Sequence, residues 1–270
     1  MSETHDKGPL LGQQVSGSAV YDPGLLFPVP RANARVSLPD GRFEGYGEDI
    51  WHAYELSWLS AQGMPQMFTG VISVPATSMN IVESKSLKLY LNSLNNHRFD
   101  SVDHAIGVIT HDLSAVAQAS VGLELFGPDD RALGGVQLNA DCLDDLLVEI
   151  PDAPEAASLR PTGDAGARLC THLMRSRCPV TDQPDWATVI IETRDAAPER
   201  ESLLAYLLAY RNHQEFHEQC VERIFTDLAD RLAPSYLSVQ ALYTRRGGLD
   251  ISPWRCSDGE PAPRGRMSRQ

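Results

Sequence analysis

The sequence has no apolar run long enough to span a bilayer, and residues 1–8 are polar and lack the apolar core of a signal peptide. Its five cysteines are odd in number and widely spaced, which favours neither a disulfide framework nor a four-thiolate zinc site. We therefore expect a cytoplasmic protein that holds no metal and binds no membrane.

Basic residues are also scarce. Lys and Arg number 23 against 36 Asp and Glu, which gives a net charge of −13. Phosphate contacts need clustered cations, so this balance disfavours a broad nucleic-acid-binding surface, while a local basic pocket for a small anion is still compatible with it. The chain has no G-x-G-x-x-G sequence, so a Rossmann dinucleotide site is not indicated. Its 270 residues, 42% of them hydrophobic, suit one large or two modest domains.

The chain contains an internal repeat. Three pairs of similar segments occur in the same order, namely 64–69 with 183–188, 86–91 with 202–207, and 120–121 with 238–239. Each half therefore predicts the order strand, turn, helix, helix, strand. Chance similarity between amphipathic helices is the alternative, but the shared order of the segments favours two copies of one module.

Hydrophobic patterns place the elements within these halves. Apolar runs rich in β-branched residues predict strands at 71–74, 121–126, 136–139, 146–150, 187–193 and 237–243. Apolar residues at helical spacing predict core-facing helices at 87–94 and 221–232, the second ended by Pro234. We expect modules at 21–151 and 167–256, a linker at 152–166 rich in Pro, Ala, Gly and Asp, and weakly ordered tails at 1–20 and 257–270.

Cys178 is the most informative residue. It lies just before the predicted strand, on a segment that also carries Asp185. A thiol beside a carboxyl group suits a nucleophile and a proton carrier, because only the thiolate attacks. A buried structural cysteine is the alternative. Aligning the repeats places Leu59 opposite Cys178 and Gln66 opposite Asp185, so the first half lacks this pair.

Other polar clusters are divided between the halves. Residues 83–86 (Glu-Ser-Lys-Ser) occur only in the first half, and His217-Glu218 only in the second. The turn at 245–248 (Arg-Arg-Gly-Gly) can hold phosphate, because glycine lets the backbone approach and Arg binds it bidentately. A helix start, a solvated helix and a solvated turn are the respective alternatives. A single site would then be built from parts of both modules.

These residues together resemble a known family. The segment 83–90 (ESKSLKLY) is similar to the signature of the NADPH-dependent 7-cyano-7-deazaguanine reductases, the nitrile reductases of queuosine biosynthesis in tRNA modification. The resemblance covers roughly residues 20–256, in the long two-module form of the family, with no departure at the motif positions. Its other matching segments are 49–51, 54–58, 178–185, 212–220 and 243–251.

The resemblance implies an α+β fold of two tandem tunnelling-fold (T-fold) modules, each an antiparallel sheet with two helices on one face, and a homodimer. It implies NADPH-dependent reduction of the nitrile of 7-cyano-7-deazaguanine to 7-aminomethyl-7-deazaguanine through a thioimidate on a cysteine. The small 7-deazaguanine would be the substrate, with no direct nucleic-acid partner.

The resemblance also assigns residues to roles. Cys178 and Asp185 would be catalytic. Substrate would be bound by Val82, Glu83, Ser84, His217 and Glu218, and NADPH by Ser84, Lys85, Arg246 and Gly247. Two alternatives stay open: a T-fold hydrolase or cyclohydrolase acting on a purine- or pterin-like base, which would need zinc, and a base-binding T-fold protein without catalysis.

Overall fold

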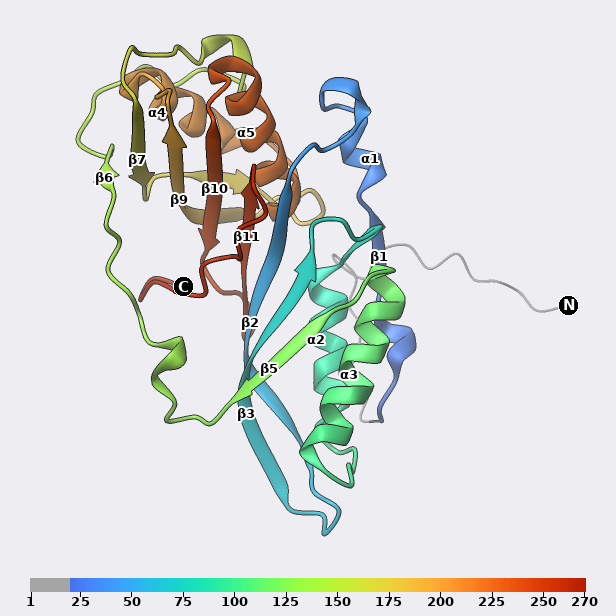
Figure 1. Cartoon of the computed structure of the whole chain (residues 1–270). Coiled ribbons are helices and arrows are strands. Elements are labelled where there is room, and N and C mark those ends of the chain that lie inside the picture. The colour runs from blue at the N-terminus through green and yellow to red at the C-terminus, as the bar shows by residue number, and fades with distance from the viewer. Residues whose placement is uncertain (1–19) are drawn as a thin grey trace, which may run out of the picture.

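The computed structural model describes residues 20–270, and the fold is built around one twisted sheet (Figure 1). The strand order is β5-β3-β2-β11-β10-β9-β7-β6, with β8 paired to β9 outside this path. Neighbouring strands are antiparallel except β6 and β7, which are parallel. The strands of this sheet are β2 (Tyr46–Leu59), β3 (Pro65–Pro75), β5 (Gly122–Phe126), β6 (Asp141–Cys142), β7 (Gly166–Thr171), β8 (Arg175–Arg177), β9 (Pro184–Arg194), β10 (Tyr236–Tyr243) and β11 (Leu249–Cys256).

The remaining elements are helices and one short strand pair. Strands β1 (Pro28–Pro30) and β4 (Asn80–Val82) form a separate antiparallel pair. The helices are α1 (Ala32–Arg35), α2 (Ser84–Ser93), α3 (Val102–Ala117), α4 (Arg200–Leu208) and α5 (His217–Leu232), and short 3₁₀ turns occupy 23–25, 39–41, 131–133, 156–158 and 209–212. Within residues 20–270, no helix is both long and apolar enough to cross a membrane.

The two halves have the same order of elements. The first half runs β3-α2-α3-β5 and the second runs β9-α4-α5-β10. Buried details recur as well: Tyr90 donates a hydrogen bond to Asp112 at 2.7 Å, and Tyr206 donates one to Asp227 at 2.6 Å. Each pair joins the first helix of its half to the second, so the same helix contact occurs twice.

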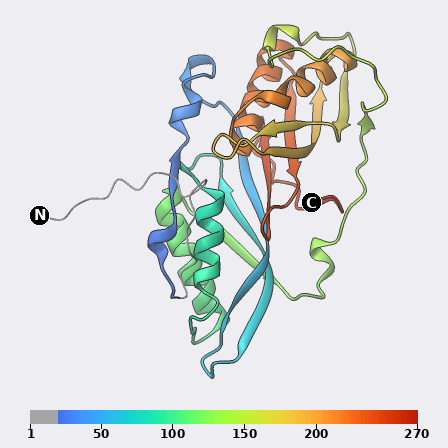
Figure 2. The same cartoon turned by 180° about the vertical axis from the view of Figure 1, so that it is seen from behind.

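Both helix pairs cover the same face of the sheet. Ile72 and Val74 pack in a core with α2 and α3, and Val189 and Ile191 pack in a core with α4 and α5. Val239 of the second core lies opposite Arg255 in β11, and Ile251 of the first core precedes Arg255 by four residues on the same strand. Because side chains an even number of residues apart on a strand point to the same face, Val239 and Ile251 lie on one face of the sheet. In the second half, α4 and α5 lie behind the strands in Figure 1 and in front of them in Figure 2.

The two halves meet where β2 pairs with β11. Their antiparallel register runs from Ala53 opposite Leu249 to Tyr46 opposite Cys256. The halves therefore share one continuous sheet, and residues near the start of the chain lie beside residues near its end.

The connection between the halves differs from the prediction. Strands were predicted at 136–139 and 146–150, and both segments are irregular. The physical reason is exposure: Leu147 is 97% exposed, and Val136 and Ile150 are also exposed, so these apolar residues do not form the buried face that stabilises a strand. Only β6 joins the sheet from this connection, through two residue pairs with β7.

The tails at the two ends of the chain were predicted to be weakly ordered. The predicted weak order of residues 1–20 falls almost entirely outside the described residues. The prediction of weak order for 257–270 is wrong at its end, because Gln270 is 2% exposed. The Gln270 amide donates to Ser252 Oγ at 2.9 Å, so the chain end packs against β11.

A buried ionic cluster joins the halves. Arg31 and Arg255 both pair with Asp49 and with Glu222 of α5, and Arg35 adds a third guanidinium to Glu222 at 2.8 Å. Burial opposes ionisation of both acids, but Arg255 and its neighbours hold the pKa values of Asp49 and Glu222 below their usual range. Because Arg31 and Asp49 belong to the first half and Glu222 and Arg255 to the second, the cluster forms only when the halves dock.

We expect Glu222→Gln to lower the free energy of unfolding by about 3–5 kcal/mol at pH 7, because it leaves guanidinium groups buried without their partner. Urea denaturation measures this, with the exposed Glu201→Gln of α4 as the matched control. The lowered pKa of Glu222 means that its stabilisation is complete above the unfolded-state pKa and is lost as the pH falls through the folded-state value. The difference in the free energy of unfolding between wild type and Glu222→Gln should therefore disappear in acid. A difference that persists in acid would contradict a stabilising role for the charged Glu222.

Candidate functional site

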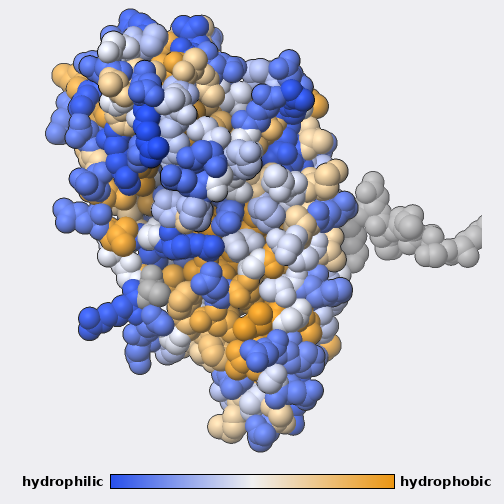
Figure 3. Space-filling model, in the orientation of Figure 1, coloured by the Kyte–Doolittle hydropathy of each residue, from blue (hydrophilic) through white to orange (hydrophobic). Residues whose placement is uncertain are grey.

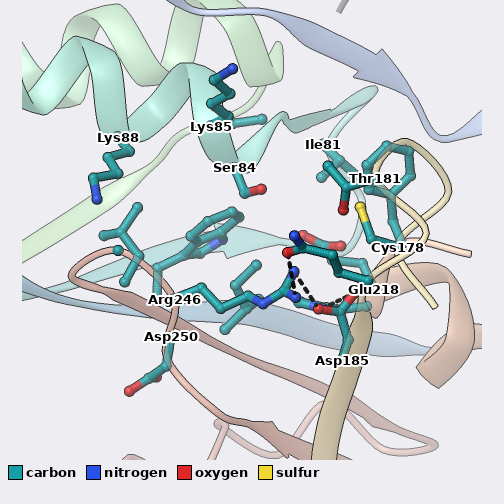
Figure 4. Close-up of a pocket in the computed structure, with 18 of the residues that line it drawn as sticks. Ile81, Ser84, Lys85, Lys88, Cys178, Thr181, Asp185, Glu218, Arg246 and Asp250 are labelled. Carbon is teal, nitrogen blue, oxygen red and sulfur yellow. Dashed lines mark hydrogen bonds and ion pairs between the residues drawn. The ribbon is translucent and has the colours of Figure 1, made fainter. Parts of the chain in front are cut away.

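A cavity of about 440 Å³ opens at the junction of the halves, directly beside the ionic cluster (Figure 4). One wall comes from the first half, through β4 and the start of α2. The other walls come from the loop between β8 and β9, the start of α5, and the hairpin between β10 and β11. Neither half alone contains this cavity, which brings together nine of the ten predicted site residues: Val82, Ser84, Lys85, Cys178, Asp185, His217, Glu218, Arg246 and Gly247.

Glu83 is the predicted site residue whose side chain does not line the cavity. Its carboxylate accepts hydrogen bonds from the backbone N–H of Lys85 at 2.9 Å and of Ser86 at 2.8 Å, which caps the N-terminus of α2. Burial raises the pKa of Glu83, although these two N–H groups favour its charged form. The cap fixes the first turn of α2, the helix whose Ser84, Lys85 and Lys88 line the cavity.

Cys178 lies on a short closed loop. Its N–H donates to the Gln183 carbonyl at 2.9 Å, and its own carbonyl accepts from the Asp182 N–H at 3.0 Å. Asp182 adopts the left-handed conformation with φ of 58°, which Asp tolerates better than most residues, and pairs with Arg177 at 2.8 Å. The thiol is 7% exposed and lines the cavity, so the loop holds a partly accessible sulfur in a fixed place.

The repeat shows what occupies this place in the first half. The Ser60 N–H donates to the Met64 carbonyl at 2.8 Å, the counterpart of the bond from Cys178 to Gln183. The second-half loop is one residue longer, so the structural partner of Cys178 is Ser60, and the sequence alignment with Leu59 was wrong by one position. The opposition of Gln66 to Asp185 holds, since each is the second residue of its strand.

Asp185 is held from two sides. Arg246 Nη1 lies 3.0 Å from one carboxylate oxygen and His217 Nε2 lies 3.3 Å from the other. Tyr243 stacks on the His217 ring with centroids 3.8 Å apart, which fixes the imidazole. The Asp185 side chain is only 6% exposed, so this carboxylate has a defined direction in the cavity (Figure 4).

Glu218 is the most perturbed acid of the cavity. Burial, and then the charge of Asp49, raise its pKa to about 7, while the neighbouring His217 acts in the opposite direction. At neutral pH this carboxyl group is therefore close to half ionised. Such a group gains much from a ligand that donates hydrogen bonds to its charged form.

The turn of the hairpin between β10 and β11 contains two glycines and forms one wall of the cavity. Gly247 and Gly248 have φ of 58° and 83°, the left-handed region that other residues rarely adopt. A Cβ atom at Gly247 would lie 2.3 Å from Lys88 Nζ, so glycine also lets the turn approach α2. Lys88 Nζ therefore lies beside this turn, while the Arg246 side chain points to Asp185 (Figure 4).

Sequence reasoning missed several lining residues, among them Trp51, Lys88, Thr181 and Asp250. Lys88 could have been found, because it lies one helical turn after Ser84 on the same face of α2. Trp51 and Asp250 lie in segments that match the family, 49–51 and 243–251, but they were given no role, because β2 and β11 were not predicted as strands. Among the residues that the structure describes, the group of three that could hold a metal ion is Cys142, Cys170 and His172, none of which lines this cavity.

Comparisons with known proteins match both halves. The family model described as "Nitrile reductase, 7-cyano-7-deazaguanine-reductase N-term" matches residues 18–125, and that described as "QueF-like protein" matches residues 184–262. A relative from Chromohalobacter salexigens is 48% identical and the alignment covers 96% of each chain. A relative from Stenotrophomonas maltophilia is 47% identical over 94% of each chain. Both are named NADPH-dependent 7-cyano-7-deazaguanine reductase.

Among solved structures, the apo form of the archaeosine synthase QueF-Like is 22% identical to this chain. The alignment covers 37% of this chain and 100% of that chain, with a TM-score of 0.34.

Proposed function

The chain belongs to the NADPH-dependent 7-cyano-7-deazaguanine reductase family, and we propose that it reduces the nitrile of 7-cyano-7-deazaguanine to the primary amine. The conversion takes two NADPH and two protons and yields 7-aminomethyl-7-deazaguanine and two NADP⁺. The observation that carries the proposal is that one cavity holds a thiol, a buried carboxylate paired with His and Arg, a second acid of raised pKa, and cationic side chains.

Cys178 supplies the nucleophile. Its sulfur adds to the nitrile carbon while the thiol proton is transferred to the nitrile nitrogen, which gives a thioimidate bonded to the protein. Two features support this role: the loop fixes the sulfur in the cavity, and the equivalent position in the first half is Ser60, a much weaker nucleophile.

Asp185 and His217 transfer protons to the substrate nitrogen. The carboxylate and the imidazole are 3.3 Å apart, which suits proton exchange between them as charge develops on the substrate nitrogen. Arg246 holds the other oxygen of Asp185, so the carboxylate keeps one orientation while protons move.

Glu218 recognises the base. A guanine-like ring presents adjacent N–H donors, and one carboxylate accepts two such bonds. The buried position of Glu218 removes competing water, and burial and the charge of Asp49 raise the pKa of Glu218, so donors that pair with its charged form gain binding energy. Val82, Ser84 and His217 complete the substrate side, and Glu83 contributes by capping the helix that carries Ser84.

NADPH fits the part of the cavity that adjoins the substrate at Ser84. The donors for NADPH are Ser84, Lys85 and Lys88 of α2 and Arg246 beside Gly247, which suit phosphate groups. When bound, the cofactor supplies the hydride. The protein's own part is to bind its phosphates and to hold the thioimidate carbon in one position.

The two alternatives receive less support. A cyclohydrolase would need a zinc ion in the cavity, and the described metal-ligand cluster lies outside it. A protein that only binds bases would not need the arrangement of Cys178, Asp185 and His217.

We further propose that residues 21–151 and 167–256 are two T-fold modules joined by 152–166, and that the chain acts as a cytoplasmic homodimer. The repeated element order and the shared helix-covered face support the modules. Strand β5 ends the sheet, and its outer edge pairs with no other described strand. Figure 3 shows apolar side chains gathered in the lower middle of its view. We place a second copy at the β5 edge, because an unpaired strand edge is a surface on which another chain can pair.

We expect Cys178→Ala to abolish both the covalent adduct and the amine product. Intact-protein mass spectrometry after mixing with the nitrile, without NADPH, measures the adduct. Cys142→Ala, which removes an exposed thiol elsewhere, is the control and should keep both. Normal turnover by Cys178→Ala would falsify the proposed function.

We expect Asp185→Asn to fold normally and to slow reduction by ~10²–10⁴-fold, because the amide keeps the shape but cannot transfer the proton. Steady-state kinetics provide the measurement. Asp182→Asn on the same loop is the matched control and should stay near the wild-type rate, since Asp182 is exposed and pairs with Arg177. A rate for Asp185→Asn within a few-fold of wild type would exclude it as an acid catalyst.

We expect the affinity for 7-cyano-7-deazaguanine to rise about 10-fold between pH 6 and pH 8. With a pKa of about 7, Glu218 is roughly one tenth ionised at the lower pH and nine tenths at the higher, and the charged form binds the base. Titration calorimetry with the Cys178→Ala protein measures binding without chemistry. Glu218→Gln should bind more weakly and show no such rise; an equal rise in that variant would assign the titration to another group.

We expect Lys85→Ala to raise the KM for NADPH by about 10–100-fold, because a hydrogen bond to a charged group contributes ~1.5–3 kcal/mol. It should raise the KM for NADH less and leave the Cys178 adduct intact. Arg168→Ala, an exposed cation of β7, is the control. An unchanged preference for NADPH would remove Lys85 from the phosphate site.

A further inference from the structure

A second group of reactive side chains lies away from the cavity, at the edge of the sheet. One ligand atom from each of Cys142, Cys170 and His172 lies within 4.8 Å of the others. Cys142 belongs to the connection between the halves and Cys170 to β7, and the parallel pairing of β6 with β7 places them directly opposite one another. His172 follows Cys170 by two residues and therefore points to the same side of the strand.

The three side chains of this group are ligands suited to a metal ion such as zinc. Two thiolates and one imidazole are ligands that Zn²⁺ prefers. With Zn–S of ~2.3 Å and Zn–N of ~2.0 Å, a tetrahedral ion holds its ligand atoms roughly 3.3–3.8 Å apart, so the observed cluster needs only a small contraction. A fourth position is open to water, because the group borders a surface hollow that Met267 also lines.

The surroundings orient the ligands. His172 Nδ1 lies 3.0 Å from the Thr188 hydroxyl, a contact that fixes the ring and leaves Nε2 for a metal. The Asp144 carboxylate accepts hydrogen bonds from the Thr171 hydroxyl at 2.6 Å and from the His172 N–H, which fixes the backbone between the two β7-side ligands. Cys142 is exposed and Cys170 is buried, so the site has an entry path on one side only.

We propose that Cys142, Cys170 and His172 form a zinc-binding site that fastens the connection between the halves to the edge of the sheet. The connection is also held there by the two residue pairs of β6 and β7, by the hydrogen bonds of Asp144, and by the ion pair of Asp141 with Arg200. The site is separate from the reductase cavity, because none of its three ligands lines that cavity. Its ligands come from the two sides of the linker, so the ion would close a loop of the chain.

Metal binding should release protons, because a thiol binds a metal ion as the thiolate. Zinc affinity should therefore rise with pH.

The test uses the full chain, stripped with a chelator and reduced with a phosphine. To remove the thiol of the cavity, all measurements are made in the Cys178→Ala background. Calorimetry with ZnCl₂ should give one ion per chain with proton release, and Co²⁺ should give thiolate charge-transfer absorption. His172→Gln and Cys142→Ser should each weaken binding by at least ~10-fold, whereas His104→Gln, an exposed histidine of α3, should not.

Cys170→Ser replaces a buried residue, so its circular dichroism is compared with wild type and the conclusion rests on the other two variants. The proposal is overturned if the reduced protein binds no zinc, if binding is unchanged in both His172→Gln and Cys142→Ser, or if the thiols yield only a disulfide between Cys142 and Cys170 on oxidation and no metal complex when reduced.

Discussion

The buried ionic cluster of Arg31, Asp49, Glu222 and Arg255 is the constraint on which the rest of the structure depends. Removing these charges from water costs several kcal/mol each, and that cost is offset only when every carboxylate meets its guanidinium groups. Because the partners come from opposite ends of the chain, the halves have one arrangement in which no charge is left unpaired. The backbone hydrogen bonds between β2 and β11 join the halves in the same arrangement.

The cavity is a consequence of this joint. Docking brings the start of α2 to face the Cys178 loop and the start of α5, and Asp49 at the joint contributes to the raised pKa of Glu218. The duplicated halves have then diverged at equivalent positions. Ser60 stands opposite Cys178 and Gln66 opposite Asp185, so one half holds the proposed reactive pair and the other presents a helix start with Lys85 and Lys88.

Hydrophobic patterns in the sequence predicted the helices and strands that are stabilised by interactions between residues close in the chain. The helical stripe at 221–232 became α5 and the apolar run at 187–193 lies within β9. The motif residues Cys178, Asp185 and Glu218 were found in one cavity because the resemblance and the repeat both pointed to them. The predicted strands at 136–139 and 146–150 failed because a short apolar run forms a strand only if a neighbouring strand and a core are present to cover it.

The sequence by itself determined the family, the helix patterns and the choice of candidate reactive residues, because these follow from periodicity and from motif residues that are close in the chain. Only the tertiary structure decided that Glu83 caps α2, that Arg246 and His217 hold Asp185, and that Cys142 meets Cys170 and His172. Those contacts join segments far apart in the sequence. They depend on strand register and on how the buried charges pair, and no local pattern encodes either.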